Sequence, residues 1–317
     1  MARKQMVFGG SSPEPSRSPS SVADAAWLAC LLEATADKPG NVTPRWSFHD
    51  MSYDDLVVSG RVARPEIARA GTRSVGATVL AIVRARRRAV AANTNLGIAL
   101  LFAPLARAAL DDRLTARSLH GRLAEVLRRL SVNDARHAYE AIRLAGAGGL
   151  GERVEHDVRS IPAVGLREAM AAAARYDRIA SEYASDYEIV FERAIPALEQ
   201  AFCDGLEPLD AIVDLYLRLL SELPDTLIAR RCGMSSARAV SAAAAGVLAA
   251  GGVRTAPGRG ALAAFDASLR GDRNRLNPGT TADLVAATLF VSLLEDTWAA
   301  GADGTAARHL RRSAVLP

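Results

Sequence analysis

Apolar residues recur along most of the chain at the three- and four-residue spacing of an amphipathic α-helix. The first such stripe begins near Ser20 and comprises Ala25, Leu28, Leu32 and Ala36. It stops at the Asp-Lys-Pro-Gly stretch of residues 37–40, because proline disfavours a helical conformation in the residue before it. The pattern therefore predicts a first helix from about residue 20, followed by a loop that runs to about His49.

The same periodicity predicts a succession of helices over the rest of the chain. Their approximate ranges are 52–70, 74–91, 95–110, 114–129, 132–145, 166–184, 186–203, 208–223, 225–231, 234–251, 257–270 and 280–299. No segment has a clear strand pattern, and neither a fixed repeat nor a Pro/Ser-rich linker follows residue 20. We expect a single all-α, multi-helix domain over residues 20–300. A disordered Ser/Pro-rich tail is expected at 1–19 and a flexible one at 301–317.

Composition supports this fold class and narrows the ligands. Half of the 317 residues are hydrophobic, 5% are aromatic, and alanine recurs in helix-favouring tracts. The 39 basic and 35 acidic residues leave a net charge of +4, a balance too even for a dedicated nucleic-acid binder. We therefore expect no nucleic-acid partner and favour small anionic, phosphorylated substrates.

Cysteine usage and hydropathy bear on the location of the protein. Cys30, Cys203 and Cys232 are an odd number without a CxxC spacing, which argues against a disulfide framework and a structural zinc site. The first twenty residues lack the apolar core of a signal peptide. Two long apolar stretches, "LGIALLFAPLA" and "LVAATLFVSLL", fall short of the roughly 20 residues that cross a bilayer. We expect a cytoplasmic protein without a membrane segment.

Three conspicuous sequence features have ordinary structural explanations. "GAGGLG" (146–151) matches a dinucleotide fingerprint but follows a helical pattern, so we expect a helix C-cap and a loop. "RARRR" (84–88) lies near the end of a predicted helix, where arginines complement the helix dipole, and no interleaved aromatic residues accompany it. The polar residues Asp177 and Glu182 belong to a band that is typical of an exposed helix face.

The features that remain are four loop-to-helix junctions. They are "KPGNV" (38–42), "NTNLG" (93–97), "LPDTLIARR" (223–231) and "NPGTTADL" (277–284). Helix capping explains each junction separately. Capping does not explain why all four carry a carboxylate, a lysine or free backbone N–H groups, which are the groups that bind a polyphosphate and its metal ion.

The last junction, "NPGTTADL", indicates which residue would hold a metal ion. Thr280 or Thr281 can cap the helix, and Asp283 falls in its first turn. Free N–H groups there would attract a phosphate, whereas the carboxylate would repel it unless a divalent cation lay between them. We therefore expect a divalent cation such as Mg²⁺, held by Asp283 against a bound polyphosphate.

In this order the four junctions resemble the triphosphoribosyl-dephospho-CoA synthase family, over roughly residues 24–297. The resemblance implies an all-α fold. It also implies transfer of the 5-triphosphoribosyl group of ATP to the 2′-hydroxyl of dephospho-CoA, with release of adenine. Breaking a ribose C1′–N bond develops oxocarbenium character, so one carboxylate would stabilise the ribose while another deprotonates the acceptor hydroxyl.

The resemblance also implies the site residues. The catalytic residues are Asp50 and Asp225, and the metal ligand is Asp283. The nucleotide-binding residues it implies are Lys38, Thr94, Gly97, Arg230 and Gly279; from the same junctions we also expect Asn95 and Thr281 to bind the nucleotide.

Two departures from the family pattern leave the acceptor open. Synthases of citrate lyase systems have Thr-His-Lys-Gly where this chain has Thr94-Asn95-Leu96-Gly97, and here His49 directly precedes Asp50. Two further stretches resemble a divergent branch that accompanies tetrahydromethanopterin-linked one-carbon metabolism. The alternatives are a biosynthetic step on a methanopterin or methanofuran precursor, or a non-enzymatic helical binding subunit. The sequence leaves a homo-oligomer open.

Overall fold

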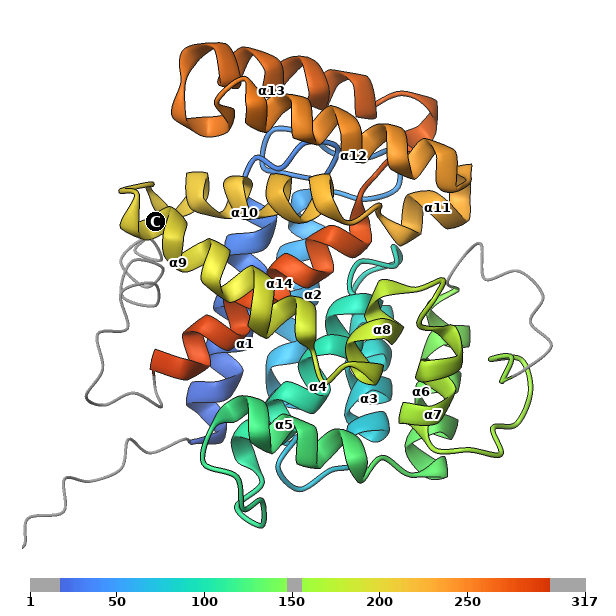
Figure 1. Cartoon of the computed structure of the whole chain (residues 1–317). Coiled ribbons are helices and arrows are strands. Elements are labelled where there is room, and N and C mark those ends of the chain that lie inside the picture. Colours follow the sequence, from blue (N-terminus) through green and yellow to red (C-terminus); the bar gives the residue numbers. More distant parts are fainter. Residues whose placement is uncertain (1–17, 147–155, 297–317) are drawn as a thin grey trace, which may run out of the picture.

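The computed structural model describes residues 18–146 and 156–296, and the backbone of these residues forms fourteen α-helices and no strand (Figure 1). The α-helices are α1 (Pro19–Thr35), α2 (Tyr53–Ala68), α3 (Val75–Ala89), α4 (Leu96–Leu110), α5 (Leu119–Arg128), α6 (Val132–Ala145), α7 (Leu166–Ala173), α8 (Arg178–Ala184), α9 (Ile195–Cys203), α10 (Pro208–Glu222), α11 (Thr226–Cys232), α12 (Met234–Ala249), α13 (Ala256–Leu269) and α14 (Gly279–Asp296). Shorter turns are the π-helix η1 (Ile189–Ala194) and the 3₁₀ turns η2 (Gly252–Arg254) and η3 (Asp272–Asn274). The all-α prediction is confirmed.

The buried helix α14 organises the core. Its apolar run from Leu284 to Leu294 lies against α1, α4, α10 and η1, and Figure 1 shows it passing through the middle of the molecule. Phe290 stacks on Phe102 of α4 with ring centroids 4.5 Å apart. Burying one such side chain contributes roughly 1.5–3 kcal/mol, so this contact helps to fix α14 against α4.

A proline inside α4 is compensated by tyrosines from another part of the chain. Pro104 has no N–H to donate, which leaves the carbonyl of Leu100 without its helical partner. The buried Tyr183 hydroxyl donates to that carbonyl at 2.6 Å, and Tyr187 donates to the carbonyl of Leu101 at 3.0 Å. These bonds fix α4 against α8 and η1.

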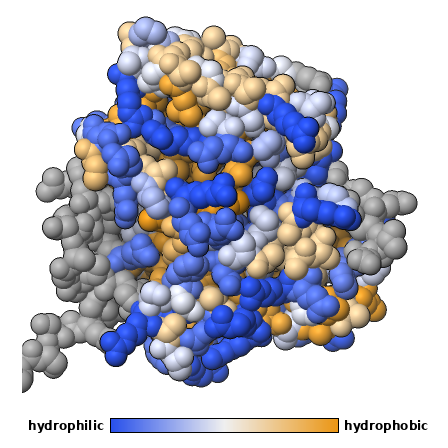
Figure 2. Space-filling model, in the orientation of Figure 1, coloured by the Kyte–Doolittle hydropathy of each residue, from blue (hydrophilic) through white to orange (hydrophobic). Residues whose placement is uncertain are grey.

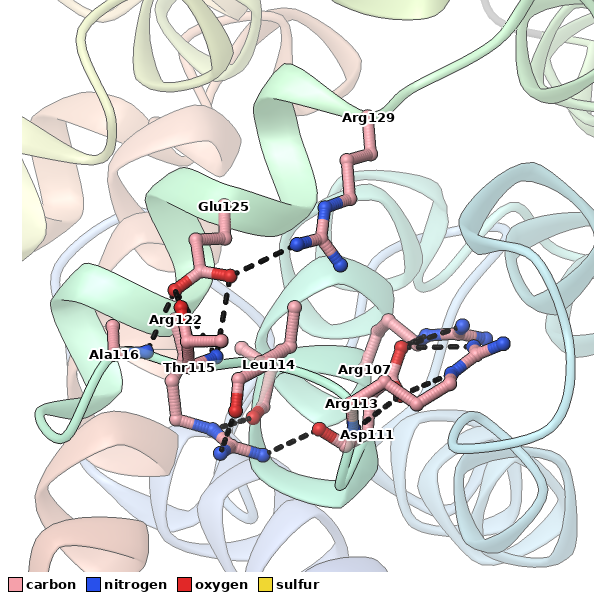
Figure 3. Close-up of polar contacts among 10 residues, drawn as sticks. Arg107, Asp111, Arg113, Leu114, Thr115, Ala116, Arg122, Glu125 and Arg129 are labelled. Atoms are coloured by element: carbon pink, nitrogen blue, oxygen red, sulfur yellow. Dashed lines mark hydrogen bonds and ion pairs between the residues drawn. The ribbon is translucent and has the colours of Figure 1, made fainter.

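The helix predicted at 114–129 begins later, at Leu119, and Figure 3 shows why. The carboxylate of Glu125 accepts the backbone N–H groups of Thr115 and Ala116, which are therefore not available to a helix. The buried Arg122 donates to the carbonyls of Ala108 and two residues of the same loop. This loop is an anchored structure rather than the first turn of a helix.

The helix predicted at 166–184 is also interrupted, by a turn between α7 and α8. The carboxylate of Asp177 accepts the N–H groups of Ile179 at 2.9 Å and Ala180 at 3.2 Å, so a new helix starts there.

Gly146 ends α6 with φ +63°, as the C-cap interpretation requires, and 147–151 lie outside the described residues. The two predicted tails, 1–19 and 301–317, also lie outside the described residues, except for residues 18 and 19.

The arginine stretch 84–88 ends α3, as predicted, but not all of it is exposed. Arg84 pairs with Glu140 of α6, whereas Arg86 is buried and donates to the carbonyl of Ala92 at 2.8 Å. Figure 2 shows a face on which hydrophilic residues predominate and hydrophobic ones lie in scattered patches.

One helical stretch of 21 residues, 234–254, is long and apolar enough to cross a membrane by length and composition alone. It packs on α10, α11 and α13, and 39% of its 18-residue apolar window is buried inside the protein. A single alanine-rich helix of this kind is weak evidence for a membrane.

Candidate active site

The four junctions line one cavity of about 290 Å³. The loop after α1, the loop before α4, helix α11 and the turn before α14 each contribute to its wall. Its apolar side comes mainly from α6, α7 and α8 and includes Ile142, Met170 and Ile179. Of the predicted site residues, those that line the cavity are Thr94, Asn95, Gly97, Arg230, Gly279 and Asp283.

Asp283 lies against the start of α4, where only a glycine leaves it room. A Cβ atom placed on Gly97 would be 2.0 Å from Oδ2 of Asp283. Burial raises the pKa of the Asp283 carboxyl well above its usual value, and the negative charges of Glu33 and Asp225 add to the effect, while Arg230 acts in the opposite direction. A cation at this carboxylate would relieve the unfavourable negative potential.

Asp225 lies behind the cavity wall. One carboxylate oxygen caps α11 by accepting the N–H of Leu227 at 2.8 Å and of Ile228 at 3.1 Å. The other accepts the N–H of Thr281 at 2.8 Å and its hydroxyl at 2.9 Å. Burial raises the pKa of Asp225, and these four hydrogen bonds oppose the rise. Asp225 and Thr281 thus join the N-terminal ends of α11 and α14, and neither lines the cavity.

Lys38 is also behind the wall. Its side chain is fully buried, its ammonium donates to the carbonyls of Glu33 and Ala36, and Nζ lies 3.0 Å from Oε1 of Glu33. Glu33, which does line the cavity, is a functional candidate that the sequence interpretation missed. The available signal was the helical spacing of Glu33 from Ala26 and Ala29, which are also buried in α1.

The two remaining predicted residues at these loops differ in exposure. Asp50 sits on the surface with 64% of its side chain exposed, 3.6 Å from His49, and does not line the cavity. Asn95 is buried, and its amide oxygen has no hydrogen-bond partner in the described part of the chain. The neighbouring Thr94 hydroxyl bonds that of Ser59 on α2.

The basic side of the cavity is Arg230 with Arg231. Arg230 forms an ion pair with Asp177, the residue that caps α8, and Asp177 also lines the cavity. The expectation that Asp177 belongs to an exposed polar face is therefore wrong: the turn between α7 and α8 directs it inward. With Glu33 and Asp283, three carboxylates and two arginines face one space.

Among the described residues, no three His, Cys, Asp or Glu side chains are grouped so that they could hold a metal ion by themselves. A divalent cation at this site would therefore need oxygen ligands from a bound substrate as well. That is the usual situation for Mg²⁺, which binds one or two protein carboxylates together with phosphate oxygens.

Comparison with known proteins identifies the family of this chain. A sequence profile of the ATP:dephospho-CoA triphosphoribosyl transferase family matches residues 19–302. The chain belongs to this family. The match includes all four junctions and every residue of the cavity wall.

Individual relatives support the assignment. A protein of Stutzerimonas stutzeri (strain A1501), named as a 2-(5''-triphosphoribosyl)-3'-dephosphocoenzyme-A synthase, is 28% identical over 249 residues, which are 66% of this chain and 83% of that protein. A synthase of the same name from Klebsiella pneumoniae is 38% identical over 98 residues, 31% of this chain and 34% of its own length. A solved structure from Archaeoglobus fulgidus, described as a triphosphoribosyl-dephospho-CoA synthase, matches with a TM-score of 0.57 and 28% identity. That match covers 75% of this chain and 97% of that one.

Proposed function

We propose that the protein transfers the 5-triphosphoribosyl group of ATP to the 2′-hydroxyl of dephospho-CoA and releases adenine. The observation that carries the proposal is the match of the family over nearly the whole chain, together with a single cavity that the four family-like junctions line. In the reaction, the bond between C1′ of the ATP ribose and the adenine nitrogen breaks. A bond from C1′ to the acceptor oxygen forms, and the acceptor proton leaves to a base.

The triphosphate would lie near the N-terminal end of α14. The N–H groups of Gly279, Thr281 and Ala282 already donate within the protein, so the attraction would come from the dipole of α14 and from the positive charges of Arg230 and Arg231. Asp177 holds one nitrogen of Arg230, whose Nε has no hydrogen-bond partner in the described part of the chain. The guanidinium thus keeps donors available for a phosphate.

The residues present fit Mg²⁺, the metal ion expected with ATP. Asp283 and Glu33 would hold it through carboxylate oxygens, which are the ligands that Mg²⁺ prefers, and Gly97 leaves the space that the Asp283 carboxylate needs. When bound, the ion would neutralise charge on the triphosphate. Lys38 balances the charge of Glu33 from behind the wall and keeps its carboxylate in place.

The carboxylates of the cavity can also stabilise the ribose as C1′ becomes positive. Glu33 and Asp177 both face the space beside Asp283, so an oxocarbenium-like ribose would lie in a negative potential. Asp225 and Thr281 contribute by joining the N-terminal ends of α11 and α14, the helices that carry Arg230 and Asp283.

A second acceptor class is favoured by one observation. Asn95 and Leu96 line the cavity at the positions where synthases of citrate lyase systems have His and Lys, so this wall has neither that base nor that cation. A hydroxyl of a methanopterin or methanofuran precursor would then be the acceptor, with the same donor chemistry.

The cellular setting is also a proposal. The three cysteines are free, which is consistent with a reducing cytoplasm. We propose a cytoplasmic enzyme whose partners are ATP, Mg²⁺ and a small-molecule acceptor.

The test is incubation of the purified protein with ATP, Mg²⁺ and dephospho-CoA, followed by chromatography of the bases released. We expect adenine in an amount equal to the new CoA derivative, and neither product when the acceptor is omitted. If adenine appears with a pterin-type hydroxyl acceptor but not with dephospho-CoA, the second acceptor class is correct. Release of no adenine with either acceptor would exclude the transferase proposal.

A further inference from the structure

The last turn of α13 and its C-cap residue Arg270 contact the backbone of residues 39–42, part of which forms the cavity wall. The carboxylate of Asp266 accepts the N–H of Gly40 at 2.8 Å, and the guanidinium of Arg270 donates to the carbonyl of Asn41 at 3.2 Å. The two side chains also bond each other at 2.7 Å. They therefore hold the peptide groups on both sides of the Gly40–Asn41 bond.

The same segment is fixed sterically between two helices. Gly40 has φ +76°, and a Cβ placed on it would lie 2.8 Å from Cδ1 of Leu269 and 3.2 Å from Cδ of Pro278. The backbone thus packs directly against the end of α13 and against the turn that begins α14. Asn41, next to Gly40, and Gly279, next to Pro278, both line the cavity.

On the inner side, α10 supplies a third attachment. The buried Tyr216 hydroxyl accepts from the side-chain amide of Asn41 at 2.7 Å and donates to the carbonyl of Pro39 at 2.9 Å. On the outer side, the guanidinium of Arg270 lies 5.0 Å from the ring centre of Trp46, so it also contacts the next part of the loop. The segment has no regular secondary structure, and these side chains determine its position.

We propose that Asp266 and Arg270 are positioning residues for the reaction. Neither lines the cavity; they act by keeping the wall at Asn41 and Val42 in register with the turn at Gly279. The proposal rests on the proposed transferase function, because it assigns the importance of that register to binding of the substrate. Nothing in the periodicity of α13 indicates it, since Asp266 and Arg270 resemble an ordinary pair of charges four residues apart.

A matched pair of variants separates positioning from simple stabilisation of α13. Asp266→Ala removes the acceptor for Gly40 and the partner of Arg270. Arg259→Ala, on the same helix, removes an ion pair of 2.7 Å with Asp210 that does not touch the loop. The pair of Arg259 is the more exposed, and Asp266→Ala also leaves the Gly40 N–H without its acceptor, so we expect a small fall in melting temperature from Arg259→Ala and a somewhat larger one from Asp266→Ala.

Activity should differ between the two variants. We expect Asp266→Ala to lower kcat/KM by about 10- to 100-fold, because small misplacements of a substrate-binding wall have effects of that size. Arg259→Ala should stay within about twofold of wild type. Asp266→Asn keeps an oxygen that accepts from Gly40, and it should recover most of the activity. Equal losses in Asp266→Ala and Arg259→Ala would overturn the proposal.

Hydrogen exchange makes the test independent of the proposed function. Amide exchange of a peptide covering residues 37–43 should become at least about tenfold faster in Asp266→Ala and stay unchanged in Arg259→Ala. If the wild-type protein neither binds ATP nor releases adenine, the transferase proposal fails while this measurement still reports on the loop. Unchanged exchange at 37–43 in Asp266→Ala would show that Asp266 does not position the segment.

Discussion

Gly97→Ala is the substitution whose effect follows most directly from the geometry of the cavity. The new methyl group would lie 2.0 Å from Oδ2 of Asp283 and 2.7 Å from Cδ1 of Ile179, whereas ordinary contacts are 3.4–4 Å. The Asp283 carboxylate must therefore move by roughly 1.4 Å or more. A displacement of about 1 Å at a reacting group costs on the order of 10²-fold in rate, so we expect turnover to fall about 100-fold.

Stability should change much less than activity in this variant. Alanine is favoured over glycine in a helix by up to about 1 kcal/mol, and overpacking costs roughly 1–3 kcal/mol. The net loss in the free energy of unfolding should be about 0–2 kcal/mol. The control is Gly246→Ala in α12, where a Cβ would meet nothing within 4 Å. That variant should be slightly more stable than wild type and fully active.

Calorimetric titration of ATP in the presence and absence of Mg²⁺ is the assay for Gly97→Ala. We expect the Mg²⁺-dependent part of the affinity to be lost, as it should be in Asp283→Asn. Because both substitutions act on one carboxylate, the double variant should be no worse than either single variant. Wild-type Mg²⁺-dependent binding in Gly97→Ala would refute the reasoning, since it would mean that the position of Asp283 does not matter.

Three further predictions concern buried polar groups. Lys38→Met should reduce the free energy of unfolding by about 3–5 kcal/mol, because it leaves the carboxylate of Glu33 buried without its cation, and urea denaturation would measure this. Tyr183→Phe should cost about 1–3 kcal/mol by leaving the carbonyl of Leu100 unbonded next to Pro104; a loss below about 0.5 kcal/mol would contradict the role assigned to the hydroxyl. Burial raises the pKa of Glu182 from 4.5 to about 7, so the folded protein retains this proton up to a higher pH than the unfolded chain does. The stability from this group is fully present below about pH 4.5 and is lost as the pH rises through 7. Glu182→Gln should therefore flatten the fall in melting temperature between pH 5 and 8, and an unchanged slope would argue against it.

The helices could be predicted from the sequence because a helix that buries one face has apolar residues at every third or fourth position. Where the prediction differs from the structure, a side chain competes for backbone N–H groups. Glu125 accepts those of Thr115 and Ala116 and delays α5, and Asp177 accepts those that start α8. Such competition depends on where a carboxylate lies in space, which hydrophobic periodicity does not report.

The candidate site could be predicted as a set of junctions but not residue by residue. Arg230 and Asp283 line the cavity because each lies on the inner side of a helix end. Lys38 and Asp225 have the expected residue types, but their hydrogen bonds are made to Glu33 and Thr281, behind the wall. Whether a loop side chain faces a ligand or the protein depends on partners far along the chain, and a single sequence does not specify them.

The burial of Glu182 could not be predicted from the sequence either. In the sequence it belongs to a polar band typical of a surface. In the structure it is fully buried, and its carboxylate accepts the N–H groups of Ile189 and Val190 at the start of η1. The irregular backbone of that turn, with φ +56° at Asp186 and φ +65° at Tyr187, creates the free N–H groups that Glu182 satisfies. Local sequence patterns do not predict such a turn.

Mass analysis of the reaction product tests the central claim most directly. ATP labelled with ¹³C in the ribose would be incubated with Mg²⁺, dephospho-CoA and either wild-type protein or Asp283→Asn. For the wild type, our account predicts free unlabelled adenine and an equal amount of an acceptor that carries the labelled ribose and all three phosphates. It predicts little of either product with the variant. Labelled ADP or AMP in place of free adenine, or equal products from both proteins, would contradict it.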